Sequence, residues 1–431
     1  MATSSLTAAR VLACPSRTAS RLAPRSAPRF VCVSVGPSST PPSSSSSAFP
    51  ATAKSGSCCG SGSTGSVSAA AASAAATAAP PATSTTAPAS PQLSPSLTSA
   101  ASEAAAYAMA NPPRTDWTRE EIQAIYSSPL LDLIFHGSQV HRAVHGNREV
   151  QQCTLLSVKT GGCSEDCSYC AQSSRYDTSL EPGKFMPEDQ VISAAKKAKE
   201  SGSTRFCMGT AWRGATGHTD DFNKVLGYVR TIKGMGMEVC CTLGMLTEQQ
   251  AVQLKEAGLT AYNHNLDTSR EFYPNVISTR TYDDRLQTIA YARNAGISVC
   301  SGGIIGMGEA EEDRVGLLYE LATLPQHPES VPVNLLVPIP GTPLESQPRV
   351  PIWDVLRMIA AARIVMPQAM VRMSAGRLGL SVAEQALCFL AGANSIFTGE
   401  RLLTTANNDK DEDAEMFQLL GLLPKPANLS L

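Results

Sequence analysis

The sequence predicts an α/β fold of the (β/α)8 TIM-type barrel class, preceded by an N-terminal helical cap and a disordered N-terminal leader. After residue 150, short β-rich runs alternate with amphipathic stretches of helical length, which is typical of βα units on a parallel sheet. Eight runs and eight stretches follow one another in the sequence, as a closed barrel requires. An open doubly wound sheet is the alternative, but no G-x-G-x-x-G follows the first strand.

Residues 1–110 differ in composition from the rest of the chain. They are rich in Ala, Ser, Thr and Pro, without a hydrophobic periodicity that could bury a core. Their six basic residues and one acidic residue give a net charge of +5, whereas the remainder, with 29 basic and 36 acidic residues, carries −7. This Arg-rich, acid-poor composition predicts a disordered transit peptide and linker. A solvated basic tail that carries no targeting signal is the simpler alternative.

Composition also limits the partners. The sequence contains no run of about 18 apolar residues, so we expect no membrane span. The mildly acidic body argues against nucleic acid as a partner. Nine of the 13 cysteines fall after the leader, where their chemistry needs a reducing compartment.

Residues 111–149 predict the helical cap. Thr118 can cap a helix whose first turn contains Glu120 and Glu121, which interact favourably with the helix dipole. A second helix is expected from Pro129 to His145.

The barrel is expected over residues 150–423, with residues 424–431 as a C-terminal tail. The predicted strands are Val150–Val158, Thr204–Met208, Glu238–Leu243, Ala261–Leu266, Ser298–Gly302, Val331–Val337, Met370–Ser374 and Ser395–Phe397. The predicted helices are Pro187–Ser201, Asp220–Gly234, Thr247–Ala257, Tyr282–Ala295, Glu311–Leu324, Ile352–Met366, Ser381–Ala391 and a last one near Glu412–Leu420. Glycines just past four helix ends suit left-handed C-caps, namely Gly202, Gly236, Gly258 and Gly296.

The loop after the first strand contains Cys163, Cys167 and Cys170, spaced four and three residues apart. Such a loop can hold three irons of a 4Fe-4S cluster and leave the fourth iron open. A zinc site would need a fourth ligand nearby, and the nearest histidines are far away in the sequence. A disulfide framework is not needed in a chain of this length.

Strand alternation predicts which polar side chains point into the barrel. One inward set contains Arg205 with Cys207, Cys240 with Thr242, Asn263 with Asn265 and Asp267, and Arg372 with Ser374. Buried polar groups need partners, so this set predicts a site rather than a packing core.

Cys207, Cys240 and Cys300 would meet inside the barrel and suggest a second metal centre. Single buried cysteines often act as small hydrophobes, and we prefer that structural interpretation for Cys241 and His264, which have the opposite parity, and for Cys388 in a helix. It also applies to Cys153, which could point either way.

The three-cysteine motif, with Tyr169 before its last cysteine, resembles that of the radical S-adenosylmethionine enzymes. Five separated blocks together resemble the biotin synthase family, over roughly Leu130 to Leu423. They are Cys163-Ser-Glu-Asp-Cys-Ser-Tyr-Cys-Ala-Gln-Ser-Ser-Arg, Gly202-Ser-Thr-Arg-Phe-Cys-Met-Gly, Tyr262-Asn-His-Asn-Leu-Asp-Thr-Ser, Val299-Cys-Ser-Gly-Gly and Ala393-Asn-Ser-Ile-Phe.

The resemblance implies two clusters. Cys163, Cys167 and Cys170 would hold a 4Fe-4S cluster whose open iron binds S-adenosylmethionine, the source of 5′-deoxyadenosyl radicals. A 2Fe-2S cluster would supply the sulfur inserted between C9 and C6 of dethiobiotin, the last step of biotin biosynthesis. Its ligands would be Cys207, Cys240, Cys300 and Arg372, an arginine ligand that spacing alone could not predict.

The resemblance also implies roles for residues that bind organic ligands. For S-adenosylmethionine these are Tyr169, the methionyl-binding run Met208, Gly209, Thr210, Ala211 and Trp212, the ribose-binding Asp267, and Asn334 and Val337 near the adenosine. For dethiobiotin they are Asn265, Thr404 and Thr405.

The implied partners are a reduced ferredoxin- or flavodoxin-type electron donor, iron–sulfur assembly proteins and a second copy in a homodimer. The composition of the leader predicts import into the mitochondrion, with import into a plastid as the alternative. Two other hypotheses remain. Another radical S-adenosylmethionine barrel would lack the four inward residues of the second cluster, and an iron–sulfur electron carrier would want a fourth cysteine near Cys170.

Overall fold

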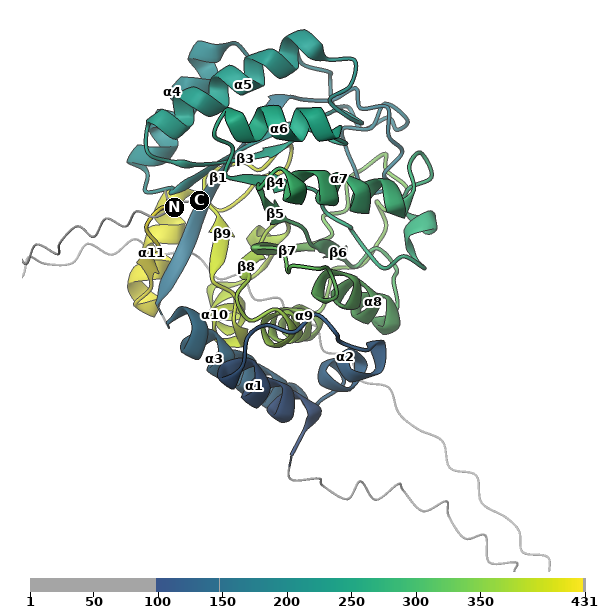
Figure 1. Cartoon of the computed structure of the whole chain (residues 1–431), viewed down its shortest axis with the longest axis vertical. Coiled ribbons are helices and arrows are strands. Elements are labelled where there is room, and N and C mark those ends of the chain that lie inside the picture. Colours follow the sequence, from purple (N-terminus) through teal and green to yellow (C-terminus); the bar gives the residue numbers. More distant parts are fainter. Residues whose placement is uncertain (1–97, 147, 429–431) are drawn as a thin grey trace, which may run out of the picture. The chain divides into compact units, whose positions relative to one another are not determined.

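The computed structural model describes residues 98–146 and 148–428 of the chain. The predicted leader up to residue 97 and residues 429–431 of the predicted tail lie outside them. Figure 1 shows strands arranged as a ring with helices around it, which confirms the predicted (β/α)8 barrel.

Within the described ranges, eight parallel strands follow the order β1-β2-β3-β4-β5-β7-β8-β9, and pairing of β9 with β1 closes the barrel. The short β6 pairs with β7, next to the end of β5. The strands are β1 Glu149–Lys159, β2 Arg205–Thr210, β3 Glu238–Thr242, β4 Ala261–Asn263, β5 Ser298–Cys300, β6 Gly303–Ile305, β7 Ser330–Leu335, β8 Met370–Met373, β9 Ser395–Phe397 and β10 Leu423–Pro424.

The predicted helices are confirmed with ends that shift by one or two residues at most sites. They are α4 Glu188–Glu200, α5 Thr219–Gly234, α6 Glu248–Glu256, α7 Tyr282–Asn294, α8 Glu311–Ala322, α9 Ile352–Val365, α10 Val382–Ala391 and α11 Lys410–Leu420. The four predicted C-cap glycines all have positive φ, between 75° and 95°. No helix in the described part of the chain combines the length and apolar character needed to cross a membrane.

The predicted cap consists of α2 (Arg119–Tyr126) and α3 (Leu130–His145). Thr118 caps α2 as expected. Its hydroxyl accepts from the Glu121 N–H at 3.2 Å, and the Glu121 carboxylate accepts from the Thr118 N–H at 2.8 Å. This reciprocal pair satisfies two backbone donors at the start of the helix.

The expectation that residues 1–110 are wholly disordered is wrong at its C-terminal end, because α1 spans Ala100–Ala110. Ser99 caps the helix, and its buried face contains alanines only, Ala101, Ala104, Ala105 and Ala108. This is a helical period of small residues, which lets α1 pack closely on α3 and α9 (Figure 1). The cap therefore begins near residue 99 rather than 111.

Two strand predictions also need correction. The chain leaves β4 after Asn263, three residues before the predicted end, and β5 stops at Cys300. A Cβ atom at Gly302 would clash with the Pro332 carbonyl oxygen, and a Cβ atom at Gly303 would clash with the Asp267 carbonyl oxygen. Only glycine allows this close backbone approach, and the sheet resumes as β6 at Gly303.

The predicted tail is joined to the barrel. Leu423 and Pro424 pair with the first residues of β1 as β10, and the Lys425 N–H donates to the Val150 carbonyl at 2.9 Å. Further along, the Asn428 N–H donates to the Glu238 carboxylate at 2.8 Å. The described tail residues thus lie at the end of the barrel where the strands begin.

The close packing of α1 predicts a position-specific response to a larger side chain. We expect Ala105→Leu to lower the free energy of unfolding by about 1–3 kcal/mol, because it inserts methyl groups into a packed interface. Ala106→Leu is the matched control, since Ala106 is exposed on the same helix and leucine favours helix about as well as alanine. Urea unfolding of the two variants measures the difference, and equal midpoints would contradict the packing of α1.

Candidate functional site

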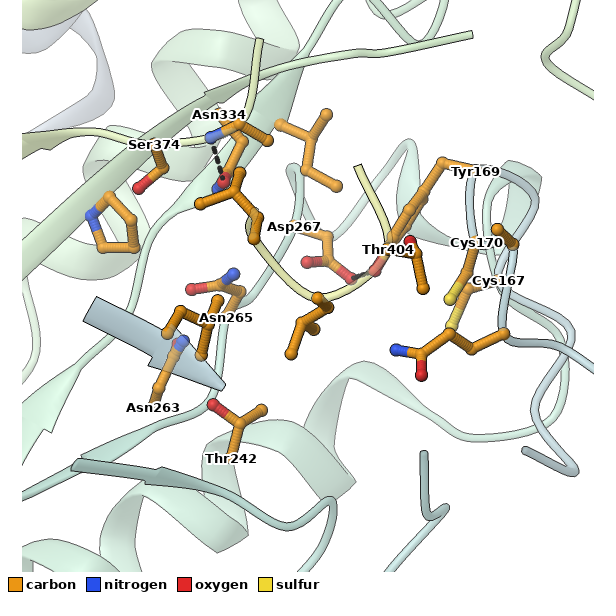
Figure 2. Close-up of a pocket in the computed structure, with 18 of the residues that line it drawn as sticks. Cys167, Tyr169, Cys170, Thr242, Asn263, Asn265, Asp267, Asn334, Ser374 and Thr404 are labelled. Atoms are coloured by element: carbon orange, nitrogen blue, oxygen red, sulfur yellow. Dashed lines mark hydrogen bonds between the residues drawn. The ribbon is translucent and has the colours of Figure 1, made fainter. Parts of the chain in front are cut away.

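A cavity of about 320 Å³ opens where the strands end and extends down into the barrel (Figure 2). Its wall comes from the loop after β1, the ends of β2, β4 and β7, and the segment after β9. This is the end of a (β/α)8 barrel at which active sites occur.

Most of the predicted site residues line this cavity. They are Cys163, Cys167, Tyr169, Cys170, Cys207, Thr210, Ala211, Trp212, Cys240, Asn265, Asp267, Asn334, Val337, Arg372, Thr404 and Thr405. Cys300, Met208 and Gly209 are not in the wall. Met208 has the outward parity on β2 and packs in the core, while Gly209 faces the Leu403 side chain.

The three-cysteine loop is held by its own backbone. The Cys163 N–H donates to the Gln172 carbonyl at 2.9 Å, and the Ser174 N–H donates to the Cys163 carbonyl at 2.7 Å. The Cys170 N–H donates to the Cys167 carbonyl at 2.9 Å. These bonds fold the loop back on itself, so that the three sulfurs share one mouth of the cavity.

Burial controls the protonation of these thiols. It raises the pKa of Cys167 to about 12 and that of Cys170 to about 11, and it also raises the pKa of Cys163. The three thiols are therefore protonated at neutral pH in the metal-free chain. Binding of iron must release these protons, since thiolate is the metal-binding form.

Asp267 connects the loop to the barrel. Its carboxylate accepts a hydrogen bond from the hydroxyl of the half-buried Tyr169 at 2.8 Å (Figure 2). It also forms an ion pair with Arg285, and both charged side chains are buried. Its backbone is left-handed, with φ of 70°, which is costly for any residue other than glycine. The Ile304 N–H donates to the Asp267 carbonyl at 2.8 Å and helps to hold this conformation.

Several polar atoms of the cavity wall have no partner. The side-chain oxygens of Asn263, Asn265 and Ser374 are buried and accept or donate no hydrogen bond in the described structure. Figure 2 shows these residues on the side of the cavity away from Cys167 and Cys170. Because unsatisfied buried polar groups are costly, they indicate a polar ligand between the two sides.

Asn334 differs from them, because both ends of its amide have protein partners. It donates to the Gly303 carbonyl at 2.9 Å and accepts from the Ala375 N–H at 3.3 Å.

The floor of the cavity is formed by Arg372 and thiols. Cys207 and Cys240 are direct neighbours on β2 and β3. The Arg372 guanidinium donates to the Cys300 sulfur at 3.5 Å, the Ser395 hydroxyl at 2.9 Å and the Gln151 side-chain oxygen at 3.2 Å. Among the described residues it forms no ion pair with a carboxylate.

Cys153 is a buried cysteine, as expected, and the structure decides its direction, which the sequence left open. Its side chain points into the barrel and packs with Cys207, Cys240 and Phe397 in one buried cluster. Although burial opposes ionisation, a hydrogen bond with Cys207 and the charges of Arg372 and Arg205 lower the pKa of Cys153 to about 6. Its parity with Leu155, which also packs against this cluster, was the sequence signal for this orientation.

Two of the other structural predictions hold. Cys241 and Cys388 are buried in the core between strands and helices. His264 is less clear-cut: its ring lies 6.2 Å from that of Tyr262, yet the residue also contributes to the cavity wall. Strand alternation cannot be extended to it, because β4 ends at Asn263.

The donor sets fit iron–sulfur clusters. In the described ranges, no three His, Cys, Asp or Glu side chains converge on a point where one metal ion could bind. A cluster distributes its ligands instead, one to each iron in 4Fe-4S and two to each iron in 2Fe-2S. The mouth offers three thiols for three irons, and the floor offers the neighbouring thiols Cys207 and Cys240 and the contacting pair Cys300 and Arg372.

Residues 157–321 match the Radical SAM superfamily, and residues 332–423 match the Biotin and Thiamin Synthesis associated domain. The solved structures of methylornithine synthase (20% identical, TM-score 0.63) and of the hydrogenase maturase HydG (18%, TM-score 0.65) each cover 76% of this chain. This chain covers 98% of the first and 76% of the second. At this identity they show a shared fold.

Curated relatives are much more similar. "Biotin synthase, mitochondrial" of Arabidopsis thaliana is 68% identical over 78% of this chain and 89% of its own length. "Biotin synthase" of Schizosaccharomyces pombe is 59% identical over 72% and 86%, and the mitochondrial form of Emericella nidulans is 55% identical over 73% and 80%.

The barrel and the three-cysteine mouth therefore define a radical S-adenosylmethionine enzyme, a class that carries a 4Fe-4S cluster and uses S-adenosylmethionine. Within that class, the chain belongs to the biotin synthase family.

The role of Asp267 at the mouth predicts a large loss of stability on truncation. We expect Asp267→Ala to lower the free energy of unfolding of the metal-free chain by about 3–5 kcal/mol, because it leaves Arg285 buried without its carboxylate. Asp283→Ala is the control, since Asp283 pairs with Arg270 at the surface and is 76% exposed, which predicts less than about 1 kcal/mol. Urea denaturation compares them, and similar losses would refute a buried ion pair at the mouth.

Proposed function

We propose that this chain converts dethiobiotin to biotin by inserting sulfur between C9 and C6. One observation supports this most strongly: a single cavity has three thiols at its mouth and a separate set of thiols with an arginine at its floor. Cleavage of S-adenosylmethionine would need only the first set, so the second set is available to supply sulfur.

The mouth residues would hold the first cluster and orient S-adenosylmethionine. Cys163, Cys167 and Cys170 would each bind one iron, and the fold of the loop would leave the fourth iron facing the cavity. Asp267 is suited to the ribose hydroxyls, since its carboxylate is already oriented by Tyr169 and Arg285.

The walls would position the rest of S-adenosylmethionine. Thr210, Ala211 and Trp212 line the cavity beside the mouth and would contact the methionyl group, with Trp212 stacked on His218 at 4.5 Å between ring centroids. Val337 and Asn334 would lie near the adenosine. The backbone partners of Asn334 make it a supporting residue as much as a binding one.

The floor residues Cys207, Cys240, Cys300 and Arg372 would hold the 2Fe-2S cluster. When bound, the two clusters and S-adenosylmethionine supply the radical chemistry that removes hydrogen atoms at C9 and C6 and the sulfur that replaces them. The chain contributes a site that excludes water, because all four floor residues are almost fully buried. It would also position the substrate relative to the clusters.

Dethiobiotin would lie between mouth and floor. Asn265 projects an unpartnered oxygen into the cavity, ready for a ureido N–H. Thr404 and Thr405 lie in a tight hairpin, in which the Leu402 N–H donates to the Thr405 carbonyl at 3.0 Å. Their hydroxyls would bind the dethiobiotin carboxylate at the rim.

Further partners follow from this activity. A ferredoxin- or flavodoxin-type protein would reduce the first cluster, iron–sulfur assembly proteins would rebuild the second, and the chain would act as a homodimer. Since two close relatives are named mitochondrial, we also propose import into the mitochondrion rather than the plastid.

Anaerobic incubation of the reconstituted chain with dethiobiotin, S-adenosylmethionine and a strong reductant tests the proposed function. We expect a biotin product heavier than dethiobiotin by one sulfur and lighter by two hydrogens, which mass spectrometry detects. Cleavage of S-adenosylmethionine with no sulfur-containing product would refute the proposal.

A matched pair of cysteine variants tests the role of the floor. Cys300→Ala should lose the 2Fe-2S signal and biotin formation while still cleaving S-adenosylmethionine, because Cys163, Cys167 and Cys170 remain. Cys241→Ala, a buried cysteine outside the barrel lumen, should retain both. Mössbauer spectra measure the 2Fe-2S signal of both variants, and the biotin assay measures their product. Biotin formation by Cys300→Ala would show that the floor cluster is not the sulfur donor.

A fluorescent fusion tests the leader. Residues 1–97, which precede α1, fused to a fluorescent protein should direct it into mitochondria in plant cells, where both organelles are present. A diffuse cytosolic signal would contradict the transit peptide, and a plastid signal would contradict the mitochondrial assignment.

A further inference from the structure

Cys153 is a thiol inside the barrel that the proposed cluster does not use. It lies on β1, opposite Arg205 of β2 and Phe397 of β9. Its side chain is fully buried and packs with Cys207 and Cys240 in one cluster. The floor therefore offers five donors for the four protein positions of a 2Fe-2S cluster.

Ser395 connects the fifth donor to the arginine. Its hydroxyl lies 4.0 Å from the Cys153 sulfur and accepts from Arg372 Nε at 2.9 Å. The same hydroxyl donates to the Gln151 side chain at 3.3 Å, so its position is fixed. A chain of hydrogen-bonding groups thus leads from the Cys153 thiol to the guanidinium of Arg372.

We propose that Cys153 is a reserve ligand of the 2Fe-2S site, which takes over the position of Arg372 when the arginine leaves the iron. This inference rests on the proposed function. Sulfide removed from the cluster leaves the irons short of a ligand, and a thiol already in the floor can keep them bound.

The exchange balances without an oxidant or reductant. The bond between iron and an Arg372 nitrogen breaks, and a bond between iron and the Cys153 sulfur forms. The proton of the Cys153 thiol passes to the departing guanidine, directly or through Ser395, and gives a guanidinium. No electron is transferred, and the thiolate and guanidinium form an ion pair in the site.

Cys241 provides a matched control. It lies next to Cys240 on β3 but has the opposite parity, and it is buried among the core residues outside the lumen. Replacing either cysteine by serine makes the same chemical change at a fully buried position. A difference in cluster binding between the two variants therefore comes from the position of Cys153 inside the barrel.

Full-length wild-type and four variants would be reconstituted anaerobically with 57Fe: Cys153→Ser, Arg372→Ala, Arg372→Ala/Cys153→Ser and Arg372→Ala/Cys241→Ser. Mössbauer spectra give the 2Fe-2S content per chain, and resonance Raman spectra report the iron–cysteine stretches. We expect Arg372→Ala to retain the cluster with an added iron–cysteine contribution. Arg372→Ala/Cys153→Ser should bind it about tenfold more weakly, and Arg372→Ala/Cys241→Ser should match Arg372→Ala.

The inference fails if the Arg372→Ala cluster is already lost, or if adding Cys153→Ser or Cys241→Ser has equal effects. The 4Fe-4S signal of each variant, which depends on the mouth cysteines, checks that the barrel is folded. A wild-type chain with the 4Fe-4S signal but no 2Fe-2S signal would overturn the sulfur-donor assignment, and the reserve ligand with it. If the wild-type chain holds the 2Fe-2S cluster but Cys153→Ser does not weaken binding of the cluster by Arg372→Ala, only the proposal of a reserve ligand is overturned.

Discussion

Arg372 imposes the constraint on which the inner half of the barrel depends. A guanidinium that is 1% exposed needs a partner of opposite charge or a full set of acceptors. In the described structure its acceptors are the neutral side chains of Ser395 and Gln151 and the sulfur of Cys300. The available negative charge is therefore thiolate, and thiolates buried together are stable when they are bound to metal.

A second arginine beneath this floor is neutralised in the ordinary way. Arg205 contacts the Glu238 carboxylate at 2.6 Å, and both side chains are buried. Gln151 donates to Glu238 at 3.2 Å and accepts from Arg372, so the two arginines belong to one network. The Asn428 N–H adds a hydrogen bond to Glu238 from the tail. This layer lies beneath the floor of the cavity, at the end of the barrel where the strands begin.

Local rules were sufficient to predict most of the fold and the inward residues of β2, β3 and β8, including Arg372. They failed where a local pattern has more than one meaning. A run of alanines is compatible with disorder and with the thin helix α1. Only packing against α3 and α9 determines that the helix forms. Between β5 and β6 the backbone passes close to Pro332 of β7 and to Asp267, which are distant in the sequence. Cys153 had the correct parity, but its inward direction depends on neighbours that a single strand does not reveal.

The mouth and the floor of the cavity differ in how widely they are expected to be shared among proteins with this fold. Proteins that share its fold at 18–20% identity have other names and reactions, so the alternation of strands and helices does not choose the chemistry. The three-cysteine mouth lies in the region that matches the whole superfamily. The floor draws on β1, β2, β3, β5 and β8, and β8 lies in the other matched region, 332–423. Both matched regions therefore contribute to one lumen, because Cys207, Cys240 and Cys300 lie in the first and Arg372 lies in the second.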